Sequence, residues 1–228
     1  MMSKSGKTMA AAVFVEKGKI GIQELPTPFP GPDEVLLRVE ACGVCGTDNH
    51  ILNGELTDGV FPPVVLGHEI AARVEQPGDG VEGFKAGQLV AVDPVIGCGI
   101  CVQCRSARPN LCEAPTTIGY KLNGGYAQYL RAPASKLIPL PDEAGVLGGV
   151  LCETLACVIN GYDRLALRAG TSAMILGAGT VGLLWLQMLR RSPVARIVQT
   201  ELAAFRRDKA KSLGADVAID PSEGDLAD

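Results

Sequence analysis

The sequence predicts an α/β fold with a β-rich N-terminal part, followed by alternating strands and helices. Short β-like runs such as AAAVFV, EVLLRVEA, EIAARVEQ, QLVAVDPV and AQYLRAP, separated by Gly and Pro, fill residues 9 to about 150. This spacing is typical of a compact, mostly antiparallel barrel. After residue 151 an apolar helix-like stretch precedes a strand, helix, strand, helix, strand pattern, which indicates a βαβαβ unit. We expect domains at residues 1–155 and 156–228.

Composition and charge place the chain among ordinary globular proteins. It has 228 residues, of which 47% are hydrophobic and 20% charged, and its formal net charge is −4. A mildly acidic chain gives no electrostatic footprint for nucleic acid, so a zinc-ribbon DNA-binding protein is disfavoured. A short basic run lies on a predicted helix, where a solvated face explains it. Its members are Arg206, Arg207, Lys209 and Lys211.

The N-terminus carries no convincing export signal. The apolar run at residues 9–15 is barely long enough for a signal peptide, no small-residue cleavage site follows it, and residues 16–19 predict the turn of a hairpin. Residues 173–189 lack charge and are nearly long enough to span a membrane. Their glycines instead favour a strand, a turn and a helix. We therefore expect a cytoplasmic, reducing setting and no membrane partner.

Both histidines of the chain lie in clusters of possible metal ligands. His50 ends the segment GVCGTDNH, and His68 lies in GHE. Cys45, His68 and Glu69 offer a thiolate, an imidazole and a carboxylate, three groups that Zn²⁺ accepts. The alternative is two unrelated surface histidines. The residue types favour a metal site, and we call Cys45, His68 and Glu69 the donor cluster.

A second group of ligands is the four-cysteine cluster in GCGICVQCRSARPNLC. Its members, Cys98, Cys101, Cys104 and Cys112, are separated by gaps of two, two and seven residues. Four thiolates close a tetrahedral site without an open position, which describes a structural zinc. The gap and Pro pattern of the bacterial ferredoxin iron–sulfur run is absent. Disulfides fit poorly in a chain without an export signal.

The segment GAGTVG predicts a dinucleotide site at the junction of a strand and a helix. Gly177, Gly179 and Gly182 have the G-x-G-x-x-G spacing, in which the glycines permit a tight turn, close approach of a pyrophosphate and helix packing. Glu201 ends the next strand, 19 positions after Gly182, where it can bind the ribose hydroxyls. This pattern favours NAD over a loop that serves packing alone. The expected cofactor contacts also include Thr180, Val181 and Arg206.

Together these motifs resemble the zinc-dependent medium-chain alcohol and polyol dehydrogenases. The resemblance rests on GVCGTDNH, VVLGHE, the four-cysteine cluster, GGYAQY and GAGTVG, in the expected order. It implies a GroES-like catalytic domain followed by a Rossmann domain, one catalytic and one structural zinc, and hydride transfer from an alcohol or polyol to NAD. It also implies that full-length relatives are homo-oligomers.

The resemblance further assigns roles near the catalytic zinc. The third ligand is Glu153 or Cys152, and the match of the following helix to the polyol pattern favours Glu153. Glu69 coordinates the metal or bonds nearby. Thr47 and His50 are expected to relay to solvent the proton that the alcohol loses when it forms a zinc-bound alkoxide. Three other residues are expected to be structural. Asp48 is expected to fix its loop through backbone hydrogen bonds, and Cys42 and Cys157 are expected to be small buried residues.

The end of the sequence is the main departure from the family pattern. The chain stops at Asp228, after the third predicted strand of the Rossmann unit, whereas family members continue with the second half of that fold. We therefore expect a C-terminally truncated dehydrogenase, and a catalytically impaired zinc- and nucleotide-binding fragment or regulatory module is the alternative function. A zinc-independent reductase of the same superfamily is disfavoured because both metal clusters are retained.

Overall fold

The computed structural model describes residues 6–223 and divides into two compact units, Met1–Glu153 and Thr154–Asp228. The first unit is built from antiparallel sheets and the second from a parallel sheet with helices. The predicted α/β class with a β-rich N-terminal part is therefore confirmed.

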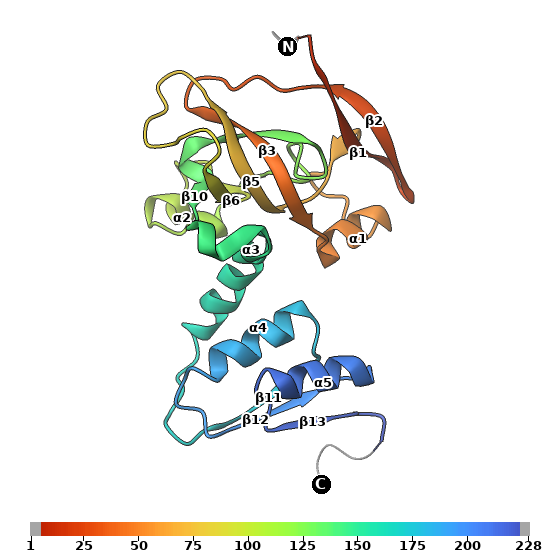
Figure 1. Ribbon diagram of the computed structural model, residues 1–228, viewed down its shortest axis with the longest axis vertical. Helices are drawn as coiled ribbons and strands as arrows, with labels where there is room; N and C mark the ends of the chain where they lie inside the picture. The colour runs from red at the N-terminus through yellow and green to blue at the C-terminus, as the bar shows by residue number, and fades with distance from the viewer. Residues whose placement is uncertain (1–5, 224–228) are drawn as a thin grey trace. The chain divides into compact units, whose positions relative to one another are not determined.

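Two antiparallel sheets make up most of the first unit (Figure 1). The smaller has the strand order β2-β1-β4, and the larger has the order β10-β6-β5-β3-β9. Their bounds are β1 (Thr8–Glu16), β2 (Lys19–Pro26), β3 (Glu34–Gly43), β4 (Val64–Val65), β5 (Glu69–Pro77), β6 (Leu89–Val92), β9 (Tyr129–Pro133) and β10 (Leu137–Pro139). The predicted hairpin is confirmed, since Glu16 of β1 pairs with Lys19 of β2.

The larger sheet has a continuous apolar core. Val35 and Leu37 of β3 face the same side of the sheet, and they cluster with Ile70 and Val74 of β5 and Val90 of β6. Each such side chain is almost completely buried, and burial of one stabilises the fold by about 1.5–3 kcal/mol.

The pairing of β3 with β5 positions the donor cluster. Gly43, the last residue of β3, lies opposite Glu69, the first residue of β5. The segments that leave β3 and enter β5 therefore meet at one end of the sheet. Cys45 and His68 each lie within two residues of that pair, so the register brings both donor segments to the same place.

Short elements complete the first unit. They are α1 (Gly46–Leu52), β7 (Val95–Ile96), α2 (Val102–Arg105), β8 (Thr116–Thr117) and three turns of 3₁₀ helix at Pro109–Leu111, Ala134–Lys136 and Asp142–Ala144. The long helix α3 (Gly145–Tyr162) contains the boundary between the units. Among the described residues, one helical stretch, Asp142–Tyr162, is long and apolar enough to cross a membrane, but by length and composition alone.

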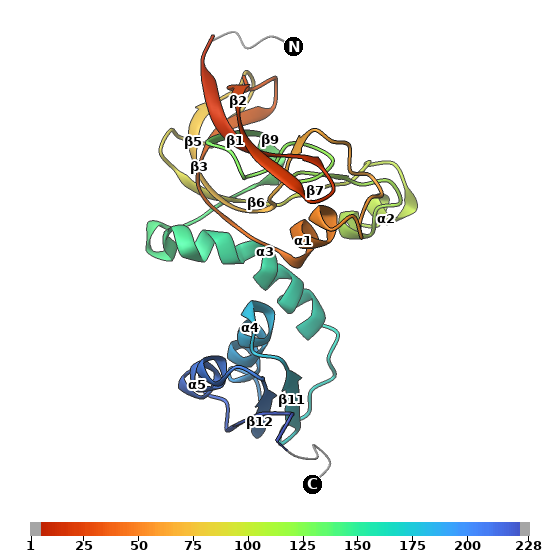
Figure 2. The same cartoon turned by 90° about the vertical axis from the view of Figure 1, so that its right-hand side faces the viewer.

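The second unit is a three-stranded parallel sheet in the order β11-β12-β13. Figures 1 and 2 show α4 and α5 on one face of this sheet. Apolar side chains of both helices, among them Leu186 and Ala210, pack there against Ile175 and Ile197. The elements run β11 (Ser172–Leu176), α4 (Thr180–Leu189), β12 (Arg196–Thr200), α5 (Ala204–Ser212) and β13 (Val217–Ile219). This order confirms the predicted βαβαβ pattern.

Candidate metal and dinucleotide sites

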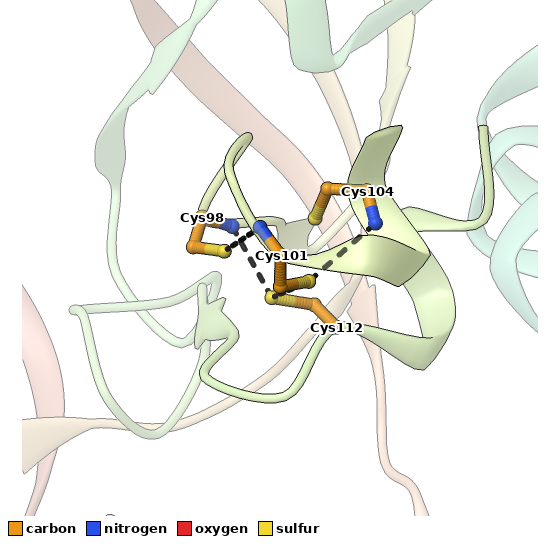
Figure 3. A group of neighbouring side chains, drawn as sticks. All are labelled: Cys98, Cys101, Cys104 and Cys112. Carbon is orange, nitrogen blue, oxygen red and sulfur yellow. Dashed lines mark hydrogen bonds between the residues drawn. The ribbon is translucent and has the colours of Figure 1, made fainter. Parts of the chain in front are cut away.

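The four-cysteine cluster is already arranged to hold a metal ion. The sulfur atoms of its members lie within 4.8 Å of one another, and Figure 3 shows them converging from α2 and the loops beside it. Cys101 caps the N-terminus of the short helix α2, and a turn of 3₁₀ helix, Pro109–Leu111, leads directly to Cys112. None of the eight cysteines, all of which lie among the described residues, forms a disulfide.

Backbone N–H groups within this cluster point at sulfur. Cys98 N–H donates to Cys112 Sγ at 3.2 Å, Cys101 N–H to Cys98 Sγ at 3.4 Å, and Cys104 N–H to Cys101 Sγ at 3.5 Å. The N–H of Cys104 is the largest cause that lowers the pKa of Cys101, to about 6. Such donors stabilise thiolates, the form that binds zinc. The cluster fits a closed structural zinc site in both ligand type and geometry.

Asp48 ties the two segments of the donor cluster together. Asp48 is 5% exposed, and its carboxylate accepts hydrogen bonds from Cys45 N–H at 2.9 Å and from Gly67 N–H at 3.3 Å. The first bond closes the start of α1, as in a capping box. The second fixes the residue before His68. The expectation that Asp48 fixes its loop through backbone hydrogen bonds is confirmed.

His68 is a buried imidazole with unused bonding capacity. Its side chain is 9% exposed, and its Nδ1 lies 3.9 Å from Asp48 Oδ1, which is too long for a hydrogen bond. Among the described residues this nitrogen has no hydrogen-bond partner. A buried polar atom without a partner is costly unless a ligand or water satisfies the ring. A thiol, this imidazole and a carboxylate form a donor set that suits zinc.

The donor cluster is more open than the four-cysteine cluster. In the described part of the chain, the four-cysteine cluster is the one group of three or more possible ligands whose donor atoms all lie within 4.8 Å. Cys45, His68, Glu69 and Glu153 do not form such a group. Glu69 packs over Gly43, whose missing Cβ leaves room for the carboxylate. Convergence of these four residues on one metal stays a prediction.

The two candidates for a further ligand lie on α3 and face different surroundings. Gly149 packs against Ala71 of β5, because a Cβ at that glycine would lie 2.8 Å from the Ala71 Cβ. Glu153 follows Gly149 by four residues and so shares its helix face. Cys152 instead donates a hydrogen bond to the carbonyl of Gly148 in its own helix, at 3.4 Å.

The predicted relay residues both lie on α1. Thr47 is half-buried, and its Oγ1 lies 3.7 Å from Cys45 Sγ. His50 is exposed, and its Nδ1 lies 2.5 Å from Glu55 Oε2. Because Thr47 and His50 are three residues apart on a helix, they share a face. The hydrogen bond with His50 is the largest cause that lowers the pKa of Glu55, so that side chain stays ionised.

The glycine loop of the second unit has the packing that its sequence predicts. Gly177 has φ +92°, a left-handed conformation that favours glycine. A Cβ at Gly182 would lie 2.1 Å from the Gly177 carbonyl oxygen, so only glycine at position 182 lets the first turn of α4 pack this closely on the loop. A Cβ at Gly179 would meet nothing within 4 Å. Gly179 is the N-cap of α4 and receives no side-chain cap, so the helix N-terminus stays open to an anion.

Glu201 reaches back to this loop. Its carboxylate accepts hydrogen bonds from Ala178 N–H at 2.9 Å and Ala203 N–H at 3.0 Å. The backbone N–H groups of Ala203 and then Ala178 are the main causes that lower the pKa of Glu201, and the guanidinium of Arg206, 3.8 Å away, adds to them. An ionised carboxylate therefore lies beside the glycine loop.

Two polar residues of these sites were not identified from the sequence. Tyr126 places its hydroxyl oxygen 2.8 Å from Asp48 Oδ2, and its segment GGYAQY carried only the family resemblance. Gln199 is fully buried in β12 and donates from Nε2 to the Gly177 carbonyl at 2.9 Å. A polar residue inside an apolar strand was the available signal for Gln199. One expectation was wrong, because Cys157 is exposed on α3.

Comparison with known proteins confirms the resemblance to the zinc-dependent medium-chain dehydrogenases. Residues 31–142 match the alcohol dehydrogenase GroES-like domain. The chain is 35% identical over 96% of its length to an L-threonine 3-dehydrogenase of Xanthomonas campestris, and 36% identical over 94% of its length to a D-altritol 5-dehydrogenase of Agrobacterium fabrum. In each case it covers 65% of the relative.

The fold is shared with solved structures of the same kind. A zinc-binding dehydrogenase from Sinorhizobium meliloti 1021, bound to NADP, superposes with a TM-score of 0.92 at 38% identity. The match covers 96% of this chain and 64% of that structure. This chain thus spans about two thirds of the length of the proteins that it matches.

Proposed function

We propose that the protein is a zinc-dependent oxidoreductase that transfers hydride from a secondary alcohol or polyol to NAD, as the match of residues 31–142 to the alcohol dehydrogenase GroES-like domain suggests. One observation carries the proposal: a Cys, His and Glu donor cluster and a glycine loop with an acid-ended strand occur in one chain. Zinc supports alcohol activation, and the loop supports a dinucleotide. Neither feature alone requires a dehydrogenase.

The residues proposed to hold catalytic zinc are Cys45, His68 and Glu153, with Glu69 coordinating or bonding nearby. When bound, zinc supplies a Lewis acid that lowers the pKa of an alcohol hydroxyl. Glu153 is preferred to Cys152 because it shares the α3 face that packs on β5, whereas the Cys152 thiol bonds within its helix. The four-cysteine cluster is proposed to hold a structural zinc.

Thr47 and His50 would carry the substrate proton. The Thr47 hydroxyl lies beside Cys45 and can accept one proton as it passes on another. His50 is exposed, so its imidazole can exchange a proton with water. Glu55 holds the Nδ1 edge of that imidazole. The path thus leads from a half-buried hydroxyl to solvent along one face of α1.

The cofactor proposed is NAD rather than NADP, although the Sinorhizobium meliloti structure is bound to NADP. The ionised Glu201 carboxylate can accept hydrogen bonds from two ribose hydroxyls and would repel a 2′-phosphate. The loop residues and Arg206 would complete the site. We also propose a cytoplasmic setting, which the thiol state of the four-cysteine cluster favours.

Activity of the 228-residue chain tests this proposal. The zinc-loaded chain is offered sorbitol, 2,3-butanediol and threonine, each with NAD or NADP, and formation of the reduced cofactor is followed by absorbance. We expect NAD-dependent oxidation that is lost in His68→Ala and kept in Cys157→Ala. Absence of turnover with all three alcohols and both cofactors would overturn the assignment of this chain as a working dehydrogenase.

A further inference from the structure

The hydroxyl of Tyr126 lies where the two segments of the donor cluster meet. Its oxygen is 2.8 Å from Asp48 Oδ2 and 3.0 Å from the carbonyl oxygen of Gly43. Gly43 precedes Cys45 by two residues, and it pairs with Glu69 across the sheet. One phenol therefore contacts the segment on each side of Cys45.

The ring of Tyr126 contacts the segment that holds His68. A Cβ at Gly67 would lie 2.7 Å from Tyr126 Cδ1, so the ring packs directly against the residue before His68. The backbone is fixed as well, because Tyr126 N–H donates to the Leu66 carbonyl at 3.0 Å and Ala12 N–H donates to the Tyr126 carbonyl at 2.8 Å. Tyr126 is thus held in place by packing of its ring and by hydrogen bonds on both sides of its backbone.

A phenol has one proton, so it can donate to Asp48 or to Gly43 but not fully to both. The carboxylate is the better acceptor, because hydrogen bonds to charged groups are shorter and stronger. Burial raises the pKa of Tyr126, and the hydrogen bond to Asp48 raises it further. The hydroxyl therefore remains protonated and donates to Asp48.

This donation determines how Asp48 is oriented. Oδ2 is held by Tyr126 and by Cys45 N–H, whereas Oδ1 accepts from Gly67 N–H and faces His68. Without the phenol, Oδ2 keeps one donor and the carboxylate gains freedom to rotate about its χ2 bond. Such rotation changes the distance between Asp48 and His68. Groups that orient metal ligands commonly change metal affinity 10- to 100-fold when they are removed.

We propose that Tyr126 is a positioning residue of the donor cluster: its hydroxyl fixes the Asp48 carboxylate, which in turn fixes Cys45 and His68 for zinc. The inference rests on the proposed zinc site at Cys45, His68 and Glu153. It adds a residue of the GGYAQY segment, 58 positions after His68 in the sequence, to the machinery of that site.

Tyr126→Phe is the direct test, because phenylalanine keeps the ring that packs on Gly67 and removes only the hydroxyl. Tyr129→Phe is the matched control, since Tyr129 is a half-buried tyrosine of β9 whose hydroxyl is outside this network. Both variants and the parent chain are dialysed against buffers of fixed free zinc, and bound zinc is counted. We expect Tyr126→Phe to weaken the weaker of two zinc sites by about 10- to 100-fold, and to leave the four-cysteine site unchanged.

Cadmium NMR distinguishes positioning from general stability. A four-sulfur site and a mixed sulfur, nitrogen and oxygen site give separate resonances. We expect Tyr126→Phe to shift or broaden the mixed-site resonance alone, and to have no further effect when Asp48→Asn is already present. A Tyr126→Phe chain with the zinc affinity and mixed-site resonance of Tyr129→Phe would overturn the inference. A parent chain without a mixed-site resonance would instead refute the proposed catalytic zinc site, and the inference with it.

Discussion

Gly182→Ala should destabilise the second unit, whereas Gly179→Ala in the same motif should not. The new Cβ at position 182 would lie 2.1 Å from the Gly177 carbonyl oxygen, and real Cβ contacts are essentially never below 3.0 Å. The backbone must therefore move by at least the difference, 3.0 − 2.1 = 0.9 Å. Overpacking of this kind costs about 1–3 kcal/mol of folding stability. We expect a cost of about 3 kcal/mol here, because the clashing atom belongs to the backbone and cannot turn away as a side chain could.

The helix preference of alanine offsets part of that cost. Alanine is about 1 kcal/mol more favourable than glycine inside a helix, and Gly182 lies in α4. The net loss is then about 2 kcal/mol. For a unit the size of Thr154–Asp228, this lowers the melting temperature by roughly 8–16 °C. At Gly179, where a Cβ would meet no atom within 4 Å, we expect a change below about 1 kcal/mol.

The single tryptophan of the chain makes this measurable. Trp185 lies on α4 and packs against Gly161 and the apolar core of the second unit, so its fluorescence during heating reports on that unit. Gly179→Ala should keep the parent transition and weaken binding of NAD, because the added methyl group occupies the approach to the helix N-terminus. Equal melting temperatures for the two variants would refute the packing role of Gly182.

Three further predictions concern charge and metal. Cys104→Ala should cost the chain one zinc and leave the Trp185 transition unchanged, while Cys157→Ala keeps the zinc content; elemental analysis decides this. Glu201→Gln should reduce the preference for NAD over NADP by about fivefold in binding titrations, since the neutral amide no longer repels the 2′-phosphate of NADP. An unchanged preference would contradict the role of Glu201. The pKa values of Glu201 and Asp220 are lowered in the folded chain, Glu201 chiefly by Ala203 N–H and Asp220 chiefly by Ser222. Their contribution to stability is therefore present above their ordinary pKa values and lost as pH falls through the lowered ones. The melting temperature reported by Trp185 fluorescence should decrease once the pH drops below about 4.5, the ordinary pKa for Glu201. This decrease should be less steep in Glu201→Gln.

Local patterns in the sequence were sufficient for most of the fold. Short β-like runs separated by Gly and Pro predicted the strands of the first unit, and the Glu16 to Lys19 turn followed from its glycine. The glycine spacing predicted the tight turn at Gly177 and the close packing at Gly182, since both needs are met within one strand and helix. The four-cysteine cluster was predictable for the same reason.

Contacts between distant segments could not be predicted in this way. The Tyr126 hydroxyl meets Asp48 across 78 residues and Gly43 across 83 residues, and neither separation follows from local periodicity. The hydrogen bond from Gln199 to Gly177 depends on the alignment of β11 with β12. Exposure of Cys157 likewise depends on what packs against α3, which the composition of the helix alone does not reveal.

The most direct test of the two-site account is the number of zinc ions per chain, measured by elemental analysis on protein dialysed against a low-nanomolar zinc buffer. Two ions per chain, falling to one in His68→Ala and separately to one in Cys104→Ala, is the predicted result. One ion that is lost in Cys104→Ala and unaffected by His68→Ala would contradict the account, because Cys45, His68 and Glu153 would then hold no metal.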